Sequence, residues 1–130
     1  MEKVRTIEDL LADSNRYMES AHICEEKGDF IAAEGFYHIC RNIYESLESE
    51  MGAHKIEIQT GYMRTLFDSA MLPQIDANIK ENFLTKAQQL STILQQETGD
   101  IEFMIAAEGI QFELEELTKD FEKDIMLEFV

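Results

Sequence analysis

The amino-acid sequence predicts an all-α protein, folded as one domain (1–130) of about five antiparallel helices. Apolar residues recur at helical spacing along most of the chain. The composition is dominated by residues that favour helix, and only one proline and six glycines interrupt them. A chain of 130 residues is also long enough to bury a core of its own without disulfides.

The first two helices are predicted on either side of a Gly-Asp turn. Thr6 is the expected N-cap of the first helix. Gly28 suits the left-handed residue after a helix end, and Asp29 suits the N-cap of the second helix, expected over 30–50. The apolar positions of the two helices are Ile7, Leu10, Leu11, Tyr17, Ala21 and Cys24, then Phe30, Ala33, Tyr37, Cys40, Ile43 or Tyr44, and Leu47.

Three further helices follow the same pattern. A break at Gly52 precedes a third helix over 55–71, and Pro73 is expected in the first turn of a fourth, over 74–96. The pair Gly99-Asp100 precedes a fifth helix that continues nearly to the end. Their expected inward-facing residues are Ile58, Tyr62, Leu66 and Ala70; Ile75, Ile79, Phe83, Ala87, Leu90 and Leu94; and Ala107, Ile110, Leu114, Leu117, Phe121 and Ile125.

The charge balance limits the kinds of partner. The net charge is −16, from 27 acidic and 11 basic residues, so the chain is expected to repel nucleic acid and anionic membranes. A basic protein partner is favoured, although solubility alone would also explain the acidity. No apolar run reaches the length of a membrane span or a signal peptide, and two cysteines make no disulfide framework. A cytoplasmic protein with reduced thiols is expected.

Small and aromatic residues are arranged regularly across the first hairpin. Over 17–43 they are Tyr17, Ala21, Cys24, Gly28, Phe30, Ala33, Tyr37 and Cys40. This pattern resembles a tetratricopeptide repeat (TPR), in which small residues sit where two antiparallel helices cross. The resemblance implies stacked helical hairpins in a right-handed superhelix, with the fifth helix as a C-terminal cap. Because the second hairpin lacks the small residues, a simple helical bundle is the alternative fold.

The TPR resemblance also implies a binding surface. In TPR proteins the first helix of each hairpin lines a groove that holds a peptide. The side of the first helix expected to face such a groove, away from the second helix, carries Asn15, Met18, His22, Glu25 and Glu26. Since this set contains no Lys or Arg, the subtype that clamps a C-terminal carboxylate is disfavoured, and a peptide bearing Lys or Arg is favoured.

The last helix is a second candidate binding region. From 97 to 130 the chain has eleven acidic and two basic residues. Phe103, Phe112, Met126 and Phe129 are expected to lie off the main apolar stripe of this helix. Such residues either dock on another chain or pack against the fourth helix. In the first case Phe112 and Phe129 contact a partner or form a homodimer.

The tripeptide His-Ile-Cys occurs twice, at 22–24 and 38–40, and raises the question of a zinc site. Residues two apart on a helix point about 200° apart, so His22 and Cys24 cannot bind one ion together. Across the hairpin, Cys24 and Cys40 are offset by about 9 Å, which also disfavours a disulfide. A di-iron bundle needs two Glu-x-x-His motifs, and only Glu19 and His22 supply one. We therefore expect no metal, no cofactor and no catalytic residues.

Three classes of function remain in order of preference. The first is a non-catalytic protein–protein interaction module, such as an adaptor, chaperone or inhibitor, that binds a segment of a partner. The second is an acidic inhibitor that presents carboxylates in place of phosphates to a nucleic-acid-binding enzyme. The third is a metal-dependent helical-bundle enzyme. The lack of phosphate-binding and nucleophile motifs disfavours an enzyme.

Overall fold

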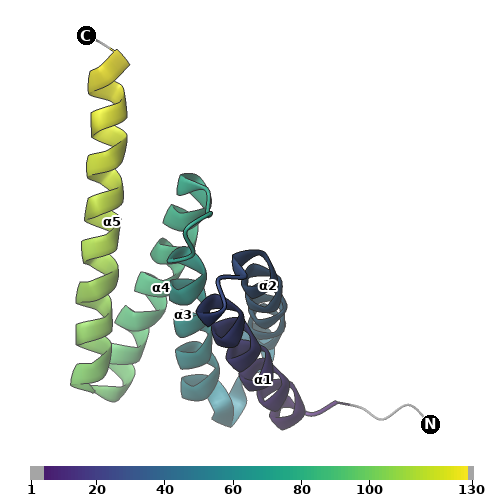
Figure 1. Cartoon of the computed structure of the whole chain (residues 1–130). Helices are drawn as coiled ribbons and strands as arrows, with labels where there is room; N and C mark the ends of the chain where they lie inside the picture. The colour runs from purple at the N-terminus through teal and green to yellow at the C-terminus, as the bar shows by residue number, and fades with distance from the viewer. Residues whose placement is uncertain (1–4, 129–130) are drawn as a thin grey trace.

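The protein is all-α in a computed structural model that describes residues 5–128, apart from the side chains of Asp124, Leu127 and Glu128. Within that range the α-helices are α1 (Ile7–Glu26), α2 (Phe30–Leu47), α3 (Lys55–Ala70), α4 (Ala77–Thr98) and α5 (Ile101–Glu128) (Figure 1). Two short 3-10 turns, Glu48–Glu50 and Gly52–His54, connect α2 to α3, and the described residues contain no strand. The predicted all-α fold is confirmed.

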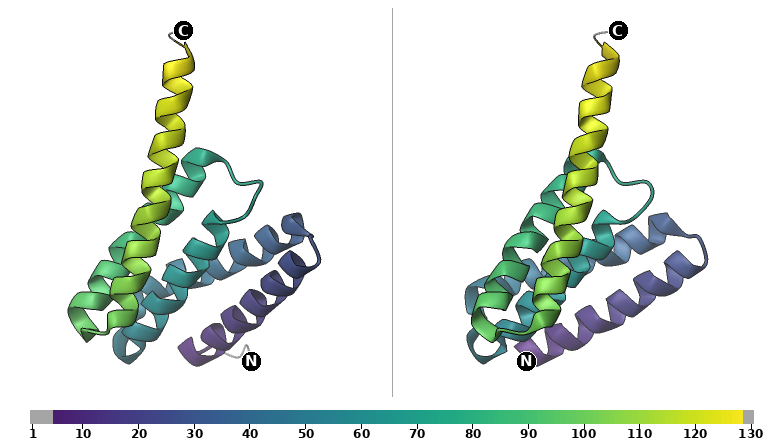
Figure 2. Two further views of the ribbon diagram at one scale, coloured as in Figure 1. Left: turned by 60° about the vertical axis from the view of Figure 1, so that its left-hand side comes forward. Right: turned by 90° about the vertical axis from the view of Figure 1, so that its left-hand side faces the viewer.

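The helices form two hairpins and a final helix. α1 pairs with α2, α3 pairs with α4, α2 packs against α3, and α5 packs against α4 (Figures 1 and 2). α5 has 28 residues and α4 has 22. At 1.5 Å per residue, α5 is therefore about 9 Å longer than its partner, and its C-terminal end rises beyond the rest of the molecule (Figure 2).

The sequence correctly predicts the start of α1, the turn between α1 and α2, and the end of α4. Thr6 and Asp9 form a capping box, each side chain accepting the other's backbone N–H. The Asp29 side chain accepts the backbone N–H of Ala32 at 3.1 Å. Gly28 and Gly99 have φ of +76° and +70°, which only glycine adopts without strain. Local residue chemistry thus fixes where α1, α2 and α4 begin or end.

The chain after α3 differs from the prediction. α4 begins at Ala77, not near residue 74, and Pro73 lies in the turn before it. The physical reason is Asp76, whose side chain accepts the backbone N–H groups of Asn78 and Ile79 and so caps the helix there. The second helix also ends earlier than predicted, at Leu47, where the backbone tightens into a 3-10 turn.

The core lies along the contacts between successive helices. Its buried members are Leu11, Cys40, Tyr44, Leu47, Ile58, Tyr62, Met63, Leu66, Ala70, Leu84, Ala87, Leu90, Leu94, Phe103 and Ile110. A smaller cluster of Ala21, Ala33, Tyr37 and Leu72 lies at the Gly28 end of the first hairpin. Most of the predicted apolar stripes are therefore buried or half-buried, and α2 and α3 supply much of the core.

Three predicted orientations are wrong. Ile79 and Ile125 were expected to face inward, but both are exposed. Ile79 lies in the first turn of α4, and Ile125 lies in the last turn of α5, so neither has a neighbouring helix to cover it. Phe103 was expected off the stripe, either docked on another chain or packed against the fourth helix. It is buried in the core, because it precedes Ala107 by four residues and so shares the inner face of α5.

Arg41 is a buried cation that joins three helices. Its guanidinium donates to Glu34 at 2.5 Å within α2 and to the Ser69 hydroxyl of α3 at 2.6 Å. It also lies 4.4 Å from the centroid of the Phe83 ring of α4. A buried charge is tolerated when it is paired and hydrogen-bonded, and Arg41 has both the ion pair with Glu34 and the hydrogen bond to Ser69.

A candidate binding groove between α1, α3 and α5

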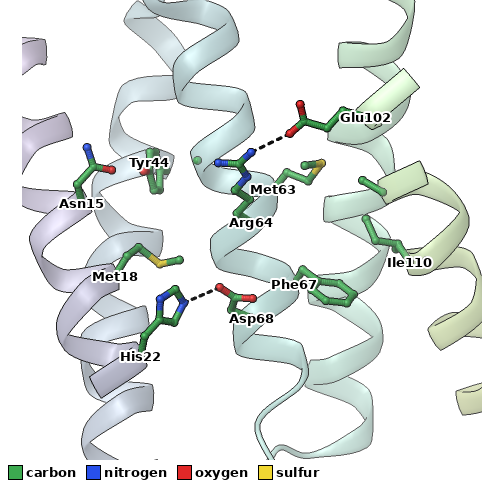
Figure 3. A pocket seen from close by; sticks show the side chains of 13 residues that line it. Asn15, Met18, His22, Tyr44, Met63, Arg64, Phe67, Asp68, Glu102 and Ile110 are labelled. Carbon is green, nitrogen blue, oxygen red and sulfur yellow. Dashed lines mark hydrogen bonds and ion pairs between the residues drawn. The ribbon is translucent and has the colours of Figure 1, made fainter. Parts of the chain in front are cut away.

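An apolar hollow beside the predicted groove residues lies between alternate helices. It has a volume of about 500 Å³ and receives side chains from α1, α3 and α5, with Tyr44 of α2 behind them (Figure 3). We term this hollow the groove. Its lining residues are Asn15, Met18, His22, Tyr44, Gly61, Met63, Arg64, Phe67, Asp68, Glu102, Ala106, Gly109 and Ile110.

The back of the groove depends on a close contact between α2 and α3. The Tyr44 hydroxyl accepts the hydroxyl proton of Ser14 at 3.0 Å and lies against the backbone of Gly61. A Cβ atom built on Gly61 would lie 2.3 Å from the Tyr44 hydroxyl oxygen. Gly61 therefore makes room for the tyrosine ring, which reaches past α3 toward α1. Burial raises the pKa of the Tyr44 hydroxyl.

Two polar pairs cross the groove. His22 of α1 hydrogen-bonds to Asp68 of α3 at 2.9 Å. Arg64 of α3 donates to Glu102 of α5 at 2.9 Å (Figure 3). All four side chains are partly exposed, so each pair contributes little to the free energy of unfolding. Each carboxylate keeps lone pairs for a further donor, because an ionised carboxylate accepts at about four positions.

The walls between these pairs are apolar. Met18, Met63, Phe67 and Ile110 contribute sulfur, aromatic and aliphatic surface. The Thr65 hydroxyl points to the Met18 sulfur at 3.3 Å, which places this side chain against α3. Methionine adapts its shape to different contacts, so the walls suit an apolar side chain of a binding partner.

The predicted groove residues fall into two groups. Asn15, Met18 and His22 line the groove. Glu25 was expected to face away from the second helix, and this is wrong, because its carboxylate accepts the Tyr37 hydroxyl of α2 at 2.6 Å. Glu26 is exposed at the end of α1 and is not part of the lining.

The two predicted residues of the last helix lie elsewhere. Phe112 is exposed on α5, in a shallow hollow with Gln95 of α4 rather than in the groove. Phe129 lies outside the described residues. The helix thus presents one side to the groove, through Glu102 and Gly109, and a different side at Phe112.

Sequence reasoning missed Arg64, Asp68 and Glu102. These residues lie in the groove because of the way α3 and α5 pack relative to α1. A local sequence pattern contains no information about that packing. The spacing of Arg64 and Asp68, four apart on one helix, was the one available signal that they share a face. The groove therefore contains one basic residue, Arg64, which forms an ion pair with Glu102.

The histidines and cysteines of the two His-Ile-Cys tripeptides lie in different surroundings. Cys24 and Cys40 are free thiols, and burial raises the pKa of Cys40 to about 11. His22 pairs with Asp68, whereas His38 is exposed and lies 3.2 Å from the Asn42 amide. Among the side chains that the structure describes, no group of three or more His, Cys, Asp or Glu residues is placed to hold a metal ion.

The fold and the groove together define an all-α helical-hairpin protein with an open, largely apolar cleft on one side. Comparison with known proteins gives no match: no protein family, curated protein or solved structure is significantly similar to the chain. Across the described part of the chain, no helix has both the length and the apolar character that crossing a lipid bilayer requires.

Proposed function

We propose that this protein is a non-catalytic, TPR-like binding module that holds a segment of another protein in the groove. The observation that carries the proposal is the set of helices that form the groove. Its walls come from α1 and α3, the first helices of the two hairpins, and from α5. This is the surface that the TPR resemblance assigns to peptide binding.

The first hairpin adds support. The TPR resemblance requires small residues where α1 and α2 cross, and Ala21, Ala33 and Cys40 have no exposed surface. The Cys40 thiol donates to the Ser14 carbonyl of α1 at 3.3 Å. A cysteine that is buried, neutral and hydrogen-bonded in this way packs as a small residue rather than acting as a nucleophile.

The chemistry of the groove indicates what it binds. Asp68 and Glu102 stand on either side of the apolar walls, and the whole chain carries a net charge of −16. A partner segment with an apolar side chain next to Lys or Arg would fill the walls and donate to these carboxylates. Long-range attraction between the acidic protein and a basic segment would speed their encounter.

Peptide selection tests this proposal. Random short peptides displayed on phage are selected on the protein, and the enriched peptides are synthesised with a fluorescent label. We expect enriched sequences to place Lys or Arg beside an apolar residue. Binding is then measured by fluorescence anisotropy against two variants that change matched helical glycines.

The two variants are Gly109→Leu, which fills the groove, and Gly35→Leu on α2, which does not line it. A Cβ at either position meets no atom within 4 Å, so both variants are expected to fold. Gly109→Leu should weaken binding by about tenfold or more, equivalent to at least about 1.4 kcal/mol, and Gly35→Leu should not. Equal affinities for the two variants would contradict the groove as the binding site.

One observation favours the acidic inhibitor as a second candidate. Glu108, Glu115 and Glu122 are exposed at seven-residue intervals along α5, so they share one face of the helix. If they replace phosphates in a nucleic-acid-binding enzyme, changing all three to Gln should abolish inhibition of that enzyme. The Gly109→Leu variant should then still inhibit, since the groove would play no part.

A further inference from the structure

A second surface on α5 has the features of a docking site and is separate from the groove. It consists of Ile101, Met104, Ile105, Glu108, Phe112 and Glu115, and we term it the outer α5 face. The side chains of Ile101, Ile105 and Phe112 are exposed by 67%, 60% and 58%. Figure 2 (right) looks onto α5, which lies in front of the other helices.

The spacing of these residues is that of a helix-pairing seam. Ile101, Ile105, Glu108, Phe112 and Glu115 follow one another at alternating intervals of four and three residues. This interval pattern places them along one stripe of the helix, as in the a and d positions of a coiled coil. The α5 residues of the groove, such as Glu102 and Gly109, lie on a different stripe. An occupant of the outer α5 face would therefore not enter the groove.

A shallow hollow runs along one edge of this face. It measures about 360 Å³ and lies between α4 and α5, lined by Gln95, Met104, Ala107, Glu108, Gln111, Phe112 and Glu115. The lining contains two carboxylates and no Lys or Arg. Exposed apolar side chains flanked only by negative charge favour an occupant that is both apolar and positively charged.

A second copy of the chain fits this surface poorly. If two outer α5 faces met, Glu108 and Glu115 would be brought toward carboxylates or apolar side chains of the other copy, because the face holds no basic residue. Unpaired charges that lose water at an interface are costly. The net charge of −16 on each copy adds repulsion.

We propose that the outer α5 face binds an amphipathic basic helix of another protein. The apolar seam of that helix packs on Ile101, Ile105 and Phe112, and its flanking Lys or Arg side chains pair with Glu108 and Glu115. Because the groove lies on another side of α5, the protein holds two partner segments at once and so acts as an adaptor.

The test uses a synthetic helical peptide as the probe. It has three heptads with Leu at the a and d positions and Lys at e and g, a fluorescent label, and a control peptide with Glu in place of Lys. Binding is followed by fluorescence anisotropy at physiological salt, where exposed charges more than about 8 Å apart are largely screened. We expect the Lys peptide to bind and the Glu peptide not to bind.

Matched variants separate this surface from general attraction to an acidic protein. Phe112→Ser should weaken binding of the Lys peptide by about tenfold or more. Ile31→Ser, at an even more exposed apolar position on α2, should change it by less than about twofold. Glu108→Lys with Glu115→Lys should abolish binding, whereas Glu50→Lys with Glu81→Lys, at exposed positions elsewhere, should not.

Several results would overturn the proposal. They are an absence of binding to the Lys peptide, equal losses with the two charge-reversed pairs, and equal binding of the Glu peptide. A dimer that sedimentation detects in the wild type and that Phe112→Ser dissociates would identify a second copy as the occupant. The Gly109→Leu variant should bind the probe normally, since it alters only the groove.

Discussion

α2 and α5 are both rich in apolar residues, yet they bury them to different extents. α2 packs between α1 and α3, and its Ala33, Tyr37 and Cys40 have no exposed surface. α5 packs mainly against α4 and leaves Ile105 and Phe112 exposed. A helix with two neighbours buries most of its apolar residues, whereas a helix with one neighbour leaves more of them available to a partner.

The comparison is tested most severely by removing one aromatic ring from each helix. Tyr37→Ala deletes a fully buried ring and its hydrogen bond to Glu25, and should lower the free energy of unfolding by about 3–5 kcal/mol. Phe112→Ala removes an exposed ring and should change it by less than about 0.5 kcal/mol. Urea denaturation followed by circular dichroism measures both. Similar losses of unfolding free energy in the two variants would show that α5 depends on its exposed ring as much as α2 depends on its buried ring.

Alkaline pH should destabilise the protein through buried ionisable groups on α2 and α3. Burial raises the pKa of Cys40 to about 11, and it also raises the pKa values of Tyr44 and Tyr62. Between pH 9 and 11 the unfolded chain loses the Cys40 proton while the folded chain keeps it. Stability is therefore complete below pH 9 and falls as the pH rises, by about 2 kcal/mol from Cys40 alone.

The matched variant for this prediction is Cys40→Ala. Its stability should fall less between pH 9 and 11 than that of the wild type, measured as urea midpoints across that range. Residues 101–128 contain no Tyr or Cys, so none of these buried groups lies on α5. An unchanged pH dependence in Cys40→Ala would show that the thiol is not the group responsible.

The contact between α2 and α3 is expected to be less tolerant than the open surface of α2. Gly61→Ala places a methyl group against the Tyr44 hydroxyl and should destabilise the protein by about 1–3 kcal/mol. Gly35→Ala meets nothing within 4 Å and should stabilise it by about 0.5–1 kcal/mol through helix propensity. Shifts of opposite sign in the thermal midpoint would support this difference between the α2–α3 contact and the open surface of α2. Shifts of the same sign would contradict it.

The smallest effect is expected at the ion pair between α3 and α5. Glu102→Gln removes the charge that accepts from Arg64, and both side chains are about 60% exposed. The free energy of unfolding should change by less than about 1 kcal/mol, and less again at high salt. A larger loss of unfolding free energy would show that polar contacts to α3, and not only packing against α4, hold α5 in place.

The sequence predicts this fold well where local chemistry decides the outcome. Thr6, Gly28, Asp29 and Gly99 mark helix ends that the structure confirms, because caps and left-handed turns depend only on neighbouring residues. The stripe of α3 is fully buried for the same reason, since a 3.6-residue period alone selects its inner face. The prediction for Ile79 fails because burial near a helix end depends on what lies beside that end. Phe103, in contrast, lies four residues before Ala107 and belongs to the buried stripe by its spacing alone.

The groove was only partly predictable. Asn15, Met18 and His22 follow from one face of one helix, so the hairpin pattern located them. Asp68 and Glu102 belong to the groove only through the packing of α3 and α5, which a single sequence does not state. Glu25 illustrates the converse, because its helical position favours the groove but the Tyr37 hydroxyl holds it against α2.

Tyr44 makes the groove optically observable. The chain contains four tyrosines and no tryptophan, so its near-ultraviolet emission comes from tyrosine alone. Tyr44 stands at the back of the groove, and its ring is stacked on Tyr62 with centroids 6.0 Å apart. A segment that enters the groove contacts one member of this pair. The unlabelled protein therefore carries its own spectroscopic reporter of occupancy, and a tryptophan-bearing ligand would quench it by energy transfer.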